Sequence, residues 1–326
     1  MSKTITAAIE RWPVAGAFII SRGAKTHVDV VCVHVSDGEF VGRGEGTPIY
    51  YEGETAESCV SAIREFAAAN PQFDKDRVNR MMQPGAARNA LDCALWNLAA
   101  QRAGMPLWQL LGMTPPQPLT TAFTISLGEP TTMERDAASA AARGYVLLKL
   151  KLTGQDDRTR VAAVHRGAPA ARLIVDANES WSGLDIVAEA AALAELGVEM
   201  IEQPLPHGDD ARLAELRTVI PLVADESCHI AADVARCAAL YDGINIKLDK
   251  AGGLTEAMKI ADAARAAGLD MMVGCMLSTS LGIAPAFLPA QSARWVDLDG
   301  PALLARDRKD GFVFADGMIA PPTNQN

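Results

Sequence analysis

Short apolar segments alternate with alanine-rich amphipathic stretches through the C-terminal two thirds of the chain, and successive apolar segments begin 21 to 27 residues apart. Apolar runs of this length are typical of buried parallel strands, and the stretches between them have room for helices. The expected strands are residues 120–126, 146–152, 172–178, 199–205, 222–227, 243–249, 270–276 and 295–299. Eight strands close a TIM-type barrel, and seven helices fit between them. The pattern therefore predicts a (β/α)7β modified TIM barrel, with a doubly wound open sheet as the alternative.

The N-terminal third of the chain has a different pattern, which predicts a smaller α+β unit with an antiparallel sheet. The expected elements are strands at residues 28–35 and 40–41 and helices at residues 54–69 and 86–103. Pro115-Pro116 ends this region, because two prolines in succession interrupt helices and strands alike. We therefore expect one domain within residues 1–115 and the barrel within residues 116–300.

Composition narrows the classes of protein to consider. The 326 residues suit two domains, and a hydrophobic content of 49% is typical of a globular chain. Lys and Arg number 30 against 40 Asp and Glu, and the resulting net charge of −10 argues against nucleic acid or an anionic membrane as a partner. The six cysteines form no C-x-x-C pair, and neither a signal peptide nor a spanning segment is visible. We expect a cytoplasmic protein with reduced thiols; a homo-oligomer is compatible with the sequence.

Acidic side chains come at the ends of three successive expected strands. Asp176, Glu202 and Asp225 lie 26 and 23 residues apart. Because the carboxyl ends of neighbouring barrel strands lie side by side, the three carboxylates can converge. Three oxygen donors without His or Cys suit a hard divalent cation. The sequence predicts a site for one Mg²⁺ per subunit, with Mn²⁺ as the alternative.

Three lysines occupy the same ends of two other strands. Lys149 and Lys151 alternate with leucines, so both point to one side of their strand. Lys247 lies four strands further round, almost diametrically opposite in an eight-stranded barrel. Two opposed amines with a cation between them suit removal of a proton next to a carboxylate, with the metal stabilising the enediolate charge. A base on one face and an acid on the other invert the centre. A cycloisomerase or a dehydratase could use the same groups.

These residues carry a resemblance to a known family. The segments concerned are Lys149-x-Lys151, Asp176-Ala-Asn178, Glu202-Gln-Pro204, Asp225-Glu226 and Asn245-Ile-Lys247. Together with the N-terminal region they resemble the enolase superfamily, muconate-lactonizing subgroup, over nearly the whole chain. The resemblance implies a capping domain over the barrel mouth, formed by residues 1–115 together with the tail, residues 301–326. It also places Gly42-x-Gly44-x-Gly46 in the sheet of the capping domain. This glycine spacing superficially suggests a phosphate-binding loop, but Pro48 and tyrosines follow it where such a loop requires a helix.

Within that subgroup the sequence is most similar to the L-Ala-D/L-Glu (dipeptide) epimerases. Asp297 and Asp299 form the Asp-x-Asp that holds the α-ammonium of a dipeptide in that group, and two acids away from the metal would suit a substrate cation. The resemblance implies Lys151 and Lys247 as the two bases. It implies that Lys149 polarises the substrate carboxylate. The remaining implied contacts with the dipeptide are Thr124, Cys275 and Arg22.

Arg22 is assigned to the γ-carboxylate of the substrate Glu, since arginine pairs with carboxylates through two hydrogen bonds, and Lys25 is its rival. The implied reaction is metal-dependent epimerisation of L-Ala-D-Glu and L-Ala-L-Glu by 1,1-proton transfer, in murein peptide turnover.

Other activities stay open. The same scaffold could serve an N-acylamino acid racemase, a muconate cycloisomerase or an o-succinylbenzoate synthase, and the acid pair argues against these because their substrates lack a cationic amine. A non-enzymatic ligand-binding barrel is the remote alternative, and a Schiff-base aldolase would leave the acidic triad without a purpose.

Overall fold

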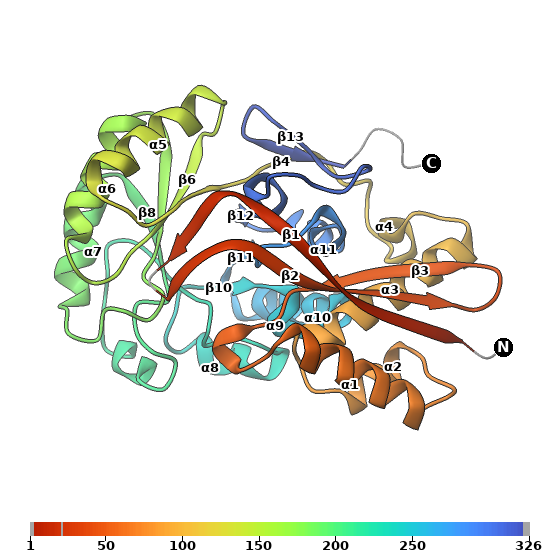
Figure 1. The fold of residues 1–326 in the computed structure, drawn as a ribbon. Helices are drawn as coiled ribbons and strands as arrows, with labels where there is room; N and C mark the ends of the chain where they lie inside the picture. The colour runs from red at the N-terminus through yellow and green to blue at the C-terminus, as the bar shows by residue number, and fades with distance from the viewer. Residues whose placement is uncertain (1–2, 21, 322–326) are drawn as a thin grey trace.

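The computed structural model describes residues 3–20 and 22–321, and its central feature is an eight-stranded parallel sheet (Figure 1). The strands are β5 (Phe123–Ile125), β6 (Leu147–Lys151), β7 (Arg172–Asp176), β8 (Val198–Glu202), β9 (Leu222–Ala224), β10 (Gly243–Ile246), β11 (Asp270–Gly274) and β12 (Trp295–Asp297). Their order in the sheet follows their order in the chain. The sheet closes where the Ala122 amide donates to the Val296 carbonyl at 2.7 Å, which brings the first strand beside the last. The predicted barrel is confirmed.

Helices connect these strands and cover the outside of the barrel. They are α5 (Pro130–Ala142), α6 (Asp157–Gly167), α7 (Ile186–Glu195), α8 (Val234–Cys237), α9 (Leu248–Ala251), α10 (Leu254–Ala267), α11 (Ser280–Ile283) and α12 (Phe287–Ala290). The connection from β8 to β9 differs from the expected pattern, because it contains a 3₁₀ turn, η2 (Asp210–Leu213), in place of an α-helix. Among the described residues, no helix is long and apolar enough to span a bilayer.

The alternation along β6 shows how the sequence sorts side chains between the inside and the outside of the barrel. Leu148 and Leu150 are fully buried in the large apolar cluster beneath the surrounding helices. Leu147 points the other way and joins Ile174 and other apolar residues in a small cluster on the barrel axis. Since side chains two apart share a face, Lys149 and Lys151 stand above this apolar floor. Both lysines are thereby held at the mouth, as the alternation predicted.

The N-terminal region forms an antiparallel sheet of β1 (Thr4–Ile20), β2 (Gly23–Ser36) and β3 (Val41–Gly46), in that order. β1 was not predicted from the sequence, and its register with β2 is broken between Pro13 and Phe18. The helical elements of this region are η1 (Tyr50–Glu52), α1 (Ala56–Ala69), α2 (Lys75–Met81), α3 (Ala86–Ala103) and α4 (Leu107–Leu110). The long strands of this sheet cross in front of the barrel strands in Figure 1.

The β3 strand lies directly against α3 because it alternates glycine with larger residues. A Cβ on Gly42, Gly44 or Gly46 would lie only 2.1 or 2.2 Å from a carbonyl oxygen of that helix. Glycine is required here for close packing of two backbones. The expectation that these glycines belong to the cap sheet, with no phosphate loop, agrees with this packing.

The tail returns to both parts of the molecule. β13 (Val313–Ala315) and β14 (Met318–Ala320) form a small sheet with β4 (Leu119–Thr120), next to the start of the barrel. Just before that hairpin, the Arg308 guanidinium pairs with Glu10 at 2.8 Å and with buried Glu45 at 2.7 Å. The division into a cap of residues 1–115 and 301–326 and a barrel of residues 116–300 stays a prediction; residues 322–326 of that tail lie outside the described part.

Replacing Gly44 by alanine tests the close packing of β3 on α3. The new methyl group would lie 2.1 Å from the Ala90 carbonyl oxygen, and neither backbone can move away freely. We expect Gly44→Ala to lower the free energy of unfolding by about 3 kcal/mol, at the upper end for overpacked cores. Chemical denaturation measures the change. Gly183→Ala is the control, because a Cβ there meets nothing within 4 Å. Equal stability of the two variants would contradict the packing argument.

Candidate active site

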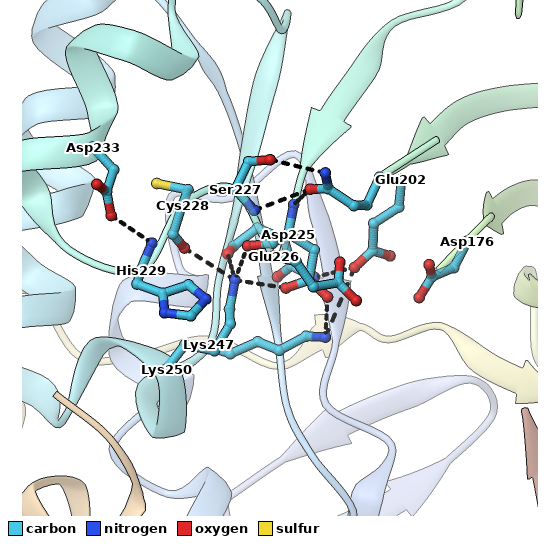
Figure 2. Close-up of polar contacts among 12 residues, drawn as sticks. Asp176, Glu202, Asp225, Glu226, Ser227, Cys228, His229, Asp233, Lys247 and Lys250 are labelled. Carbon is cyan, nitrogen blue, oxygen red and sulfur yellow. Dashed lines mark hydrogen bonds and ion pairs between the residues drawn. The ribbon is translucent and has the colours of Figure 1, made fainter. Parts of the chain in front are cut away.

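Three buried carboxylates from neighbouring strands meet at the mouth of the barrel (Figure 2). Asp176 ends β7, Glu202 ends β8, and Asp225 follows the last residue of β9. One oxygen from each lies within 4.8 Å of the others, and all three residues are at most 1% exposed. Buried carboxylates this close to one another repel strongly unless cations compensate their charge. The donor set is oxygen only, so the residues fit Mg²⁺ or Mn²⁺.

Lys149 supplies part of that compensation from β6. Its ammonium lies 2.6 Å from Glu202 Oε2, 2.8 Å from Asp297 Oδ2 and 3.5 Å from Asp176 Oδ2. Burial alone would lower the pKa of Lys149, but these carboxylates outweigh burial and raise the pKa well above its usual value. Lys149 is therefore a fixed cation that joins the acidic triad to the acid on β12.

The other two lysines stand on opposite sides of the triad. Lys151 Nζ donates to Asp176 Oδ2 at 2.6 Å, and Lys247 Nζ donates to Asp225 Oδ2 at 2.6 Å. Lys151 ends β6 and Lys247 follows β10, and these strands are four places apart in the eight-stranded order. Each lysine thus contacts a different acid at one flank of the triad, as expected for groups that reach a substrate from opposite faces.

The carboxylates differ in proton affinity although they lie together. Burial raises the pKa of Asp176, but Lys151 and Lys149 outweigh burial and bring it to about 2. Burial and the charge of Asp176 raise the pKa of Glu202 to about 7. Asp225 outweighs burial at Lys247 and raises the pKa of that lysine well above its usual value.

The acid pair at the end of β12 lies beside the triad. Asp297 Oδ2 contacts Lys149, while Asp297 Oδ1 is buried and accepts no hydrogen bond from the described residues. Asp299 Oδ2 accepts the Thr124 amide at 2.7 Å. Burial, and then the charge of Asp297, raise the pKa of Asp299 to about 7. Cys275 and Thr124 line one hollow with this acid pair and the three lysines, while Arg22 lines a different pocket.

Arg22 reaches the site from the loop between β1 and β2. Its guanidinium pairs with Glu179 at 2.7 Å and with Glu226 at 2.8 Å, and it stacks over the Tyr51 ring. The two acids outweigh burial and raise the pKa of Arg22. Lys25 lines the same pocket with its ammonium 4.2 Å from the centre of the Tyr50 ring. Ser21, the residue before Arg22, lies outside the described part of the chain.

Two residues of the site were not identified as site residues from the sequence. Lys250 is 1% exposed and its ammonium lies 2.6 Å from Asp225 Oδ1, on the other oxygen from Lys247 (Figure 2). Asn245 Nδ2 donates to Glu202 Oε1 at 2.7 Å. Asn245 belongs to the Asn245-Ile-Lys247 segment that carried the family resemblance, and Lys250 lies three residues beyond it. An isolated polar residue gives no signal in the sequence of which group its side chain contacts.

This fold and this site define the class of α/β-barrel proteins that work at the carboxyl ends of their strands. Residues 2–112 match the mandelate racemase / muconate lactonizing enzyme N-terminal domain, and residues 132–325 match the enolase C-terminal domain-like family. The chain belongs to the enolase superfamily, and the resemblance stated from the sequence is confirmed.

Two curated relatives cover nearly the whole chain. L-Ala-D/L-Glu epimerase of Escherichia coli (strain K12) is 41% identical over 97% of this chain and 99% of its own length. N-acetyl-D-glutamate racemase of Pseudoalteromonas sp. is 40% identical over 90% of this chain and 93% of its own length. The two relatives are almost equally similar, although one is named for a dipeptide and the other for an acylated amino acid.

Solved structures support the same relationship. An enolase family member from Agrobacterium tumefaciens with homology to dipeptide epimerases, described with bound sodium and L-Ala-L-Glu, is 46% identical with a TM-score of 0.94 and 98% coverage of both chains. A dipeptide epimerase from Enterococcus faecalis V583 complexed with Mg and L-Leu-L-Tyr is 29% identical with a TM-score of 0.91, over 98% of this chain and 97% of that one.

Adding a divalent cation tests the acidic triad. Because the folded triad binds the ion and the unfolded chain does not, Mg²⁺ at about 100 times its Kd should raise the free energy of unfolding by about 2.7 kcal/mol. Calorimetry in EDTA and in excess Mg²⁺ measures the shift in Tm. We expect Asp225→Asn to remove most of the shift, while Asp262→Asn, on an exposed helix face, keeps it. If neither Mg²⁺ nor Mn²⁺ shifts the Tm of the wild type, the predicted metal site is wrong.

Proposed function

We propose that this chain is a metal-dependent dipeptide epimerase whose substrates are L-Ala-D-Glu and L-Ala-L-Glu. The observation that carries the proposal is the placement of Lys151 and Lys247 on opposite flanks of the acidic triad, with a second acid pair beside it. This arrangement offers a base on each face of a substrate carbon and a separate acidic subsite. The relatives and solved structures named above for dipeptides support the proposal.

Lys151 and Lys247 perform the proton transfer in this proposal. One neutral lysine removes the proton from the Cα next to the substrate carboxylate, and the opposite ammonium returns a proton to the other face, which inverts the centre. A divalent cation held by Asp176, Glu202 and Asp225 would stabilise the negative charge that develops on the substrate carboxylate. Lys149 adds a fixed positive charge beside Glu202. With a cation on the carboxylates, the lysines no longer serve as their only counter-ions.

The acid pair on β12 supports a substrate with a free amine. Asp297 Oδ1 is a buried acceptor without a partner among the described residues, and an incoming ammonium would satisfy it. An N-acyl group brings no positive charge to this position, so Lys149 would be the nearest cation to both acids among the described residues and Asp297 Oδ1 would keep no partner. The acid pair therefore favours a dipeptide over N-acetylglutamate, although the racemase of N-acetyl-D-glutamate is a relative of nearly equal similarity.

Arg22 supports glutamate as the second residue of the dipeptide. It lines a pocket together with Lys151, Lys247 and Lys25, so a substrate bound between the two bases lies close to it. In the structure its guanidinium is paired with Glu179 and Glu226. A substrate γ-carboxylate would take the place of one of these acids, which keeps the number of ion pairs unchanged. Since L-Ala-D-Glu is a unit of murein peptides, a role in murein turnover follows from this specificity.

The setting of the enzyme is also part of the proposal. All six cysteines are free in the structure, and five of them are buried. Free thiols of this kind suit the reducing cytoplasm. We place the enzyme there, with a small dipeptide as its partner and without nucleic acid or membrane partners. Homo-oligomerisation stays a prediction.

Solvent exchange tests the two-base arrangement. With Mg²⁺ in D₂O, the wild type should place deuterium at the Cα of the Glu residue in both dipeptide diastereomers, as mass spectrometry would detect. Lys151→Ala and Lys247→Ala should each lower epimerisation by about 10³-fold or more, because each removes a general acid–base group. One-sided exchange with a single diastereomer can survive in each variant. Lys259→Ala, on an exposed helix face, is the control and should keep full activity. Two-way epimerisation by either site variant would overturn the mechanism.

Blocking the amine tests the acid pair and separates the rival activities. We expect N-acetyl-L-Ala-L-Glu and N-acetyl-D-glutamate to be turned over at least about 30-fold less efficiently than L-Ala-L-Glu, since an unpaired buried charge costs 2 kcal/mol or more. Asp299→Asn should reduce kcat/KM for the dipeptide and narrow the difference in efficiency between the free and the acetylated substrates.

The pKa of Asp299 is about 7, so KM for the dipeptide should rise as the pH falls below 7 and this carboxylate is protonated. Equal or faster turnover of N-acetyl-D-glutamate would favour the racemase instead.

A further inference from the structure

Gln203 occupies a strained position between the acidic residues of the site. It follows Glu202 directly, and its φ is 37°, in the left-handed region that side chains other than glycine rarely adopt. Strain of this kind costs about 1–3 kcal/mol and persists only where surrounding contacts hold it. Gln203 is 0% exposed, so those contacts come from the protein interior.

The carboxamide oxygen of Gln203 holds the loop that carries Asp225. Gln203 Oε1 accepts the backbone amide of Asp225 at 2.8 Å and the amide of Ser227 at 3.1 Å. Figure 2 shows Ser227 and Asp225 side by side on this loop. β9 ends at Ala224, so the Asp225 amide is the first one beyond the strand. Gln203, which follows the predicted metal ligand Glu202, thus holds the backbone of a second predicted ligand, Asp225.

The carboxamide nitrogen of Gln203 makes the complementary contacts. Nε2 has three acceptors in hydrogen-bonding range, the Leu205 carbonyl at 2.8 Å, Ser227 Oγ at 2.8 Å and the Tyr241 hydroxyl at 3.0 Å, for its two N–H groups. Tyr241 is 5% exposed and its hydroxyl also lies 3.2 Å from Ser227 Oγ. Every hydrogen-bonding group of the amide therefore has a partner, and a rotation of the side chain would break several bonds together.

The backbone of Gln203 also contacts the loop that follows β7. Its amide donates to the Val223 carbonyl at 2.9 Å, and its carbonyl accepts the Glu179 amide at 2.9 Å. Glu179 belongs to the loop after Asp176 and has a left-handed φ of 66° itself. One residue thus connects the carboxyl ends of β7, β8 and β9, where the three acids of the triad lie.

We propose that Gln203 is a positioning residue that sets the spacing of Asp176, Glu202 and Asp225 and thereby the affinity of the metal centre. This inference rests on the metal site of the proposed function and adds a residue to it that contacts neither metal nor substrate. A neutral amide suits the position, because it donates and accepts at once and adds no charge beside three acids. Loss of a partner that orients metal ligands costs 10- to 100-fold in metal affinity.

The binding of Mn²⁺ tests the proposal without an activity assay. Gln203→Met keeps the length of the side chain and removes its donors and acceptor. We expect the Kd of Mn²⁺, measured by calorimetry on the full chain, to rise about 10- to 100-fold. We also expect the EPR line shape of bound Mn²⁺ to change, since a shifted carboxylate alters the symmetry around the ion. Tyr241→Phe removes one partner of Gln203 and should give a smaller rise of about threefold.

A matched control separates positioning from general loss of stability. Asn70 is also a buried amide, 4% exposed, and donates to the Phe66 carbonyl at 2.9 Å in the cap region. Asn70→Leu should lower Tm in EDTA and leave the Kd of Mn²⁺ within twofold of the wild type. A Gln203→Met protein that folds and binds Mn²⁺ within twofold of the wild type overturns the proposal. An equal loss of affinity in Asn70→Leu overturns it as well.

Three other outcomes would also support or overturn the proposal for Gln203 or the proposed function. If Gln203→Met does not fold, an unchanged Mn²⁺ Kd in Tyr241→Phe overturns the proposal, and a raised one supports it. A wild type that binds Mn²⁺ but epimerises no dipeptide overturns the proposed function alone. A wild type that binds no Mn²⁺ overturns the inference about Gln203 together with the metal site.

Discussion

The convergence of three carboxylates in a dry barrel mouth is the constraint on which the rest of this structure depends. Asp176, Glu202 and Asp225 each present an oxygen within 4.8 Å of the others and have almost no exposure to water. Such an arrangement is unfavourable unless positive charge surrounds it. Lys149, Lys151, Lys247 and Lys250 provide that charge from the adjoining strands and loops. Two of these lysines, Lys151 and Lys247, are also the groups proposed for proton transfer, so the compensation of charge and the chemistry share residues.

The sequence was sufficient to predict the barrel and the acids because both follow from local pattern. Asp176 and Glu202 stand at the ends of short apolar strands, and parallel strands bring such ends together whatever the loops do. Lys149 and Lys151 were predictable because alternation in a strand fixes the side of each residue. The predicted seven-helix pattern was less accurate, since η2 stands where a helix was expected, and nothing in a loop of that length forces an α-helix.

Other features depend on contacts between distant segments, and for that reason they could not be predicted. β1 lacks a regular alternation because its pairing with β2 is interrupted between Pro13 and Phe18. Gln203 and Lys250 show no pattern that marks their side chains, yet these side chains end against backbone groups more than twenty positions away. Arg22 was predicted to face the substrate, and its ion pairs with Glu179 and Glu226 come from two different barrel loops. The sequence pattern predicts on which face of a helix or strand a side chain lies, whereas the residue that it contacts depends on the whole fold.

The contacts of Arg308 have a consequence for the order in which the molecule is completed. Its guanidinium joins Glu10, 298 positions earlier in the chain, and Glu45, 263 positions earlier. A nascent chain that leaves the ribosome from its N-terminus can build the β1–β2–β3 sheet early, but Glu10 and Glu45 cannot pair with Arg308 until that residue has been made. The ion pairs that join the first strands of the protein to its tail therefore form only when synthesis is almost complete.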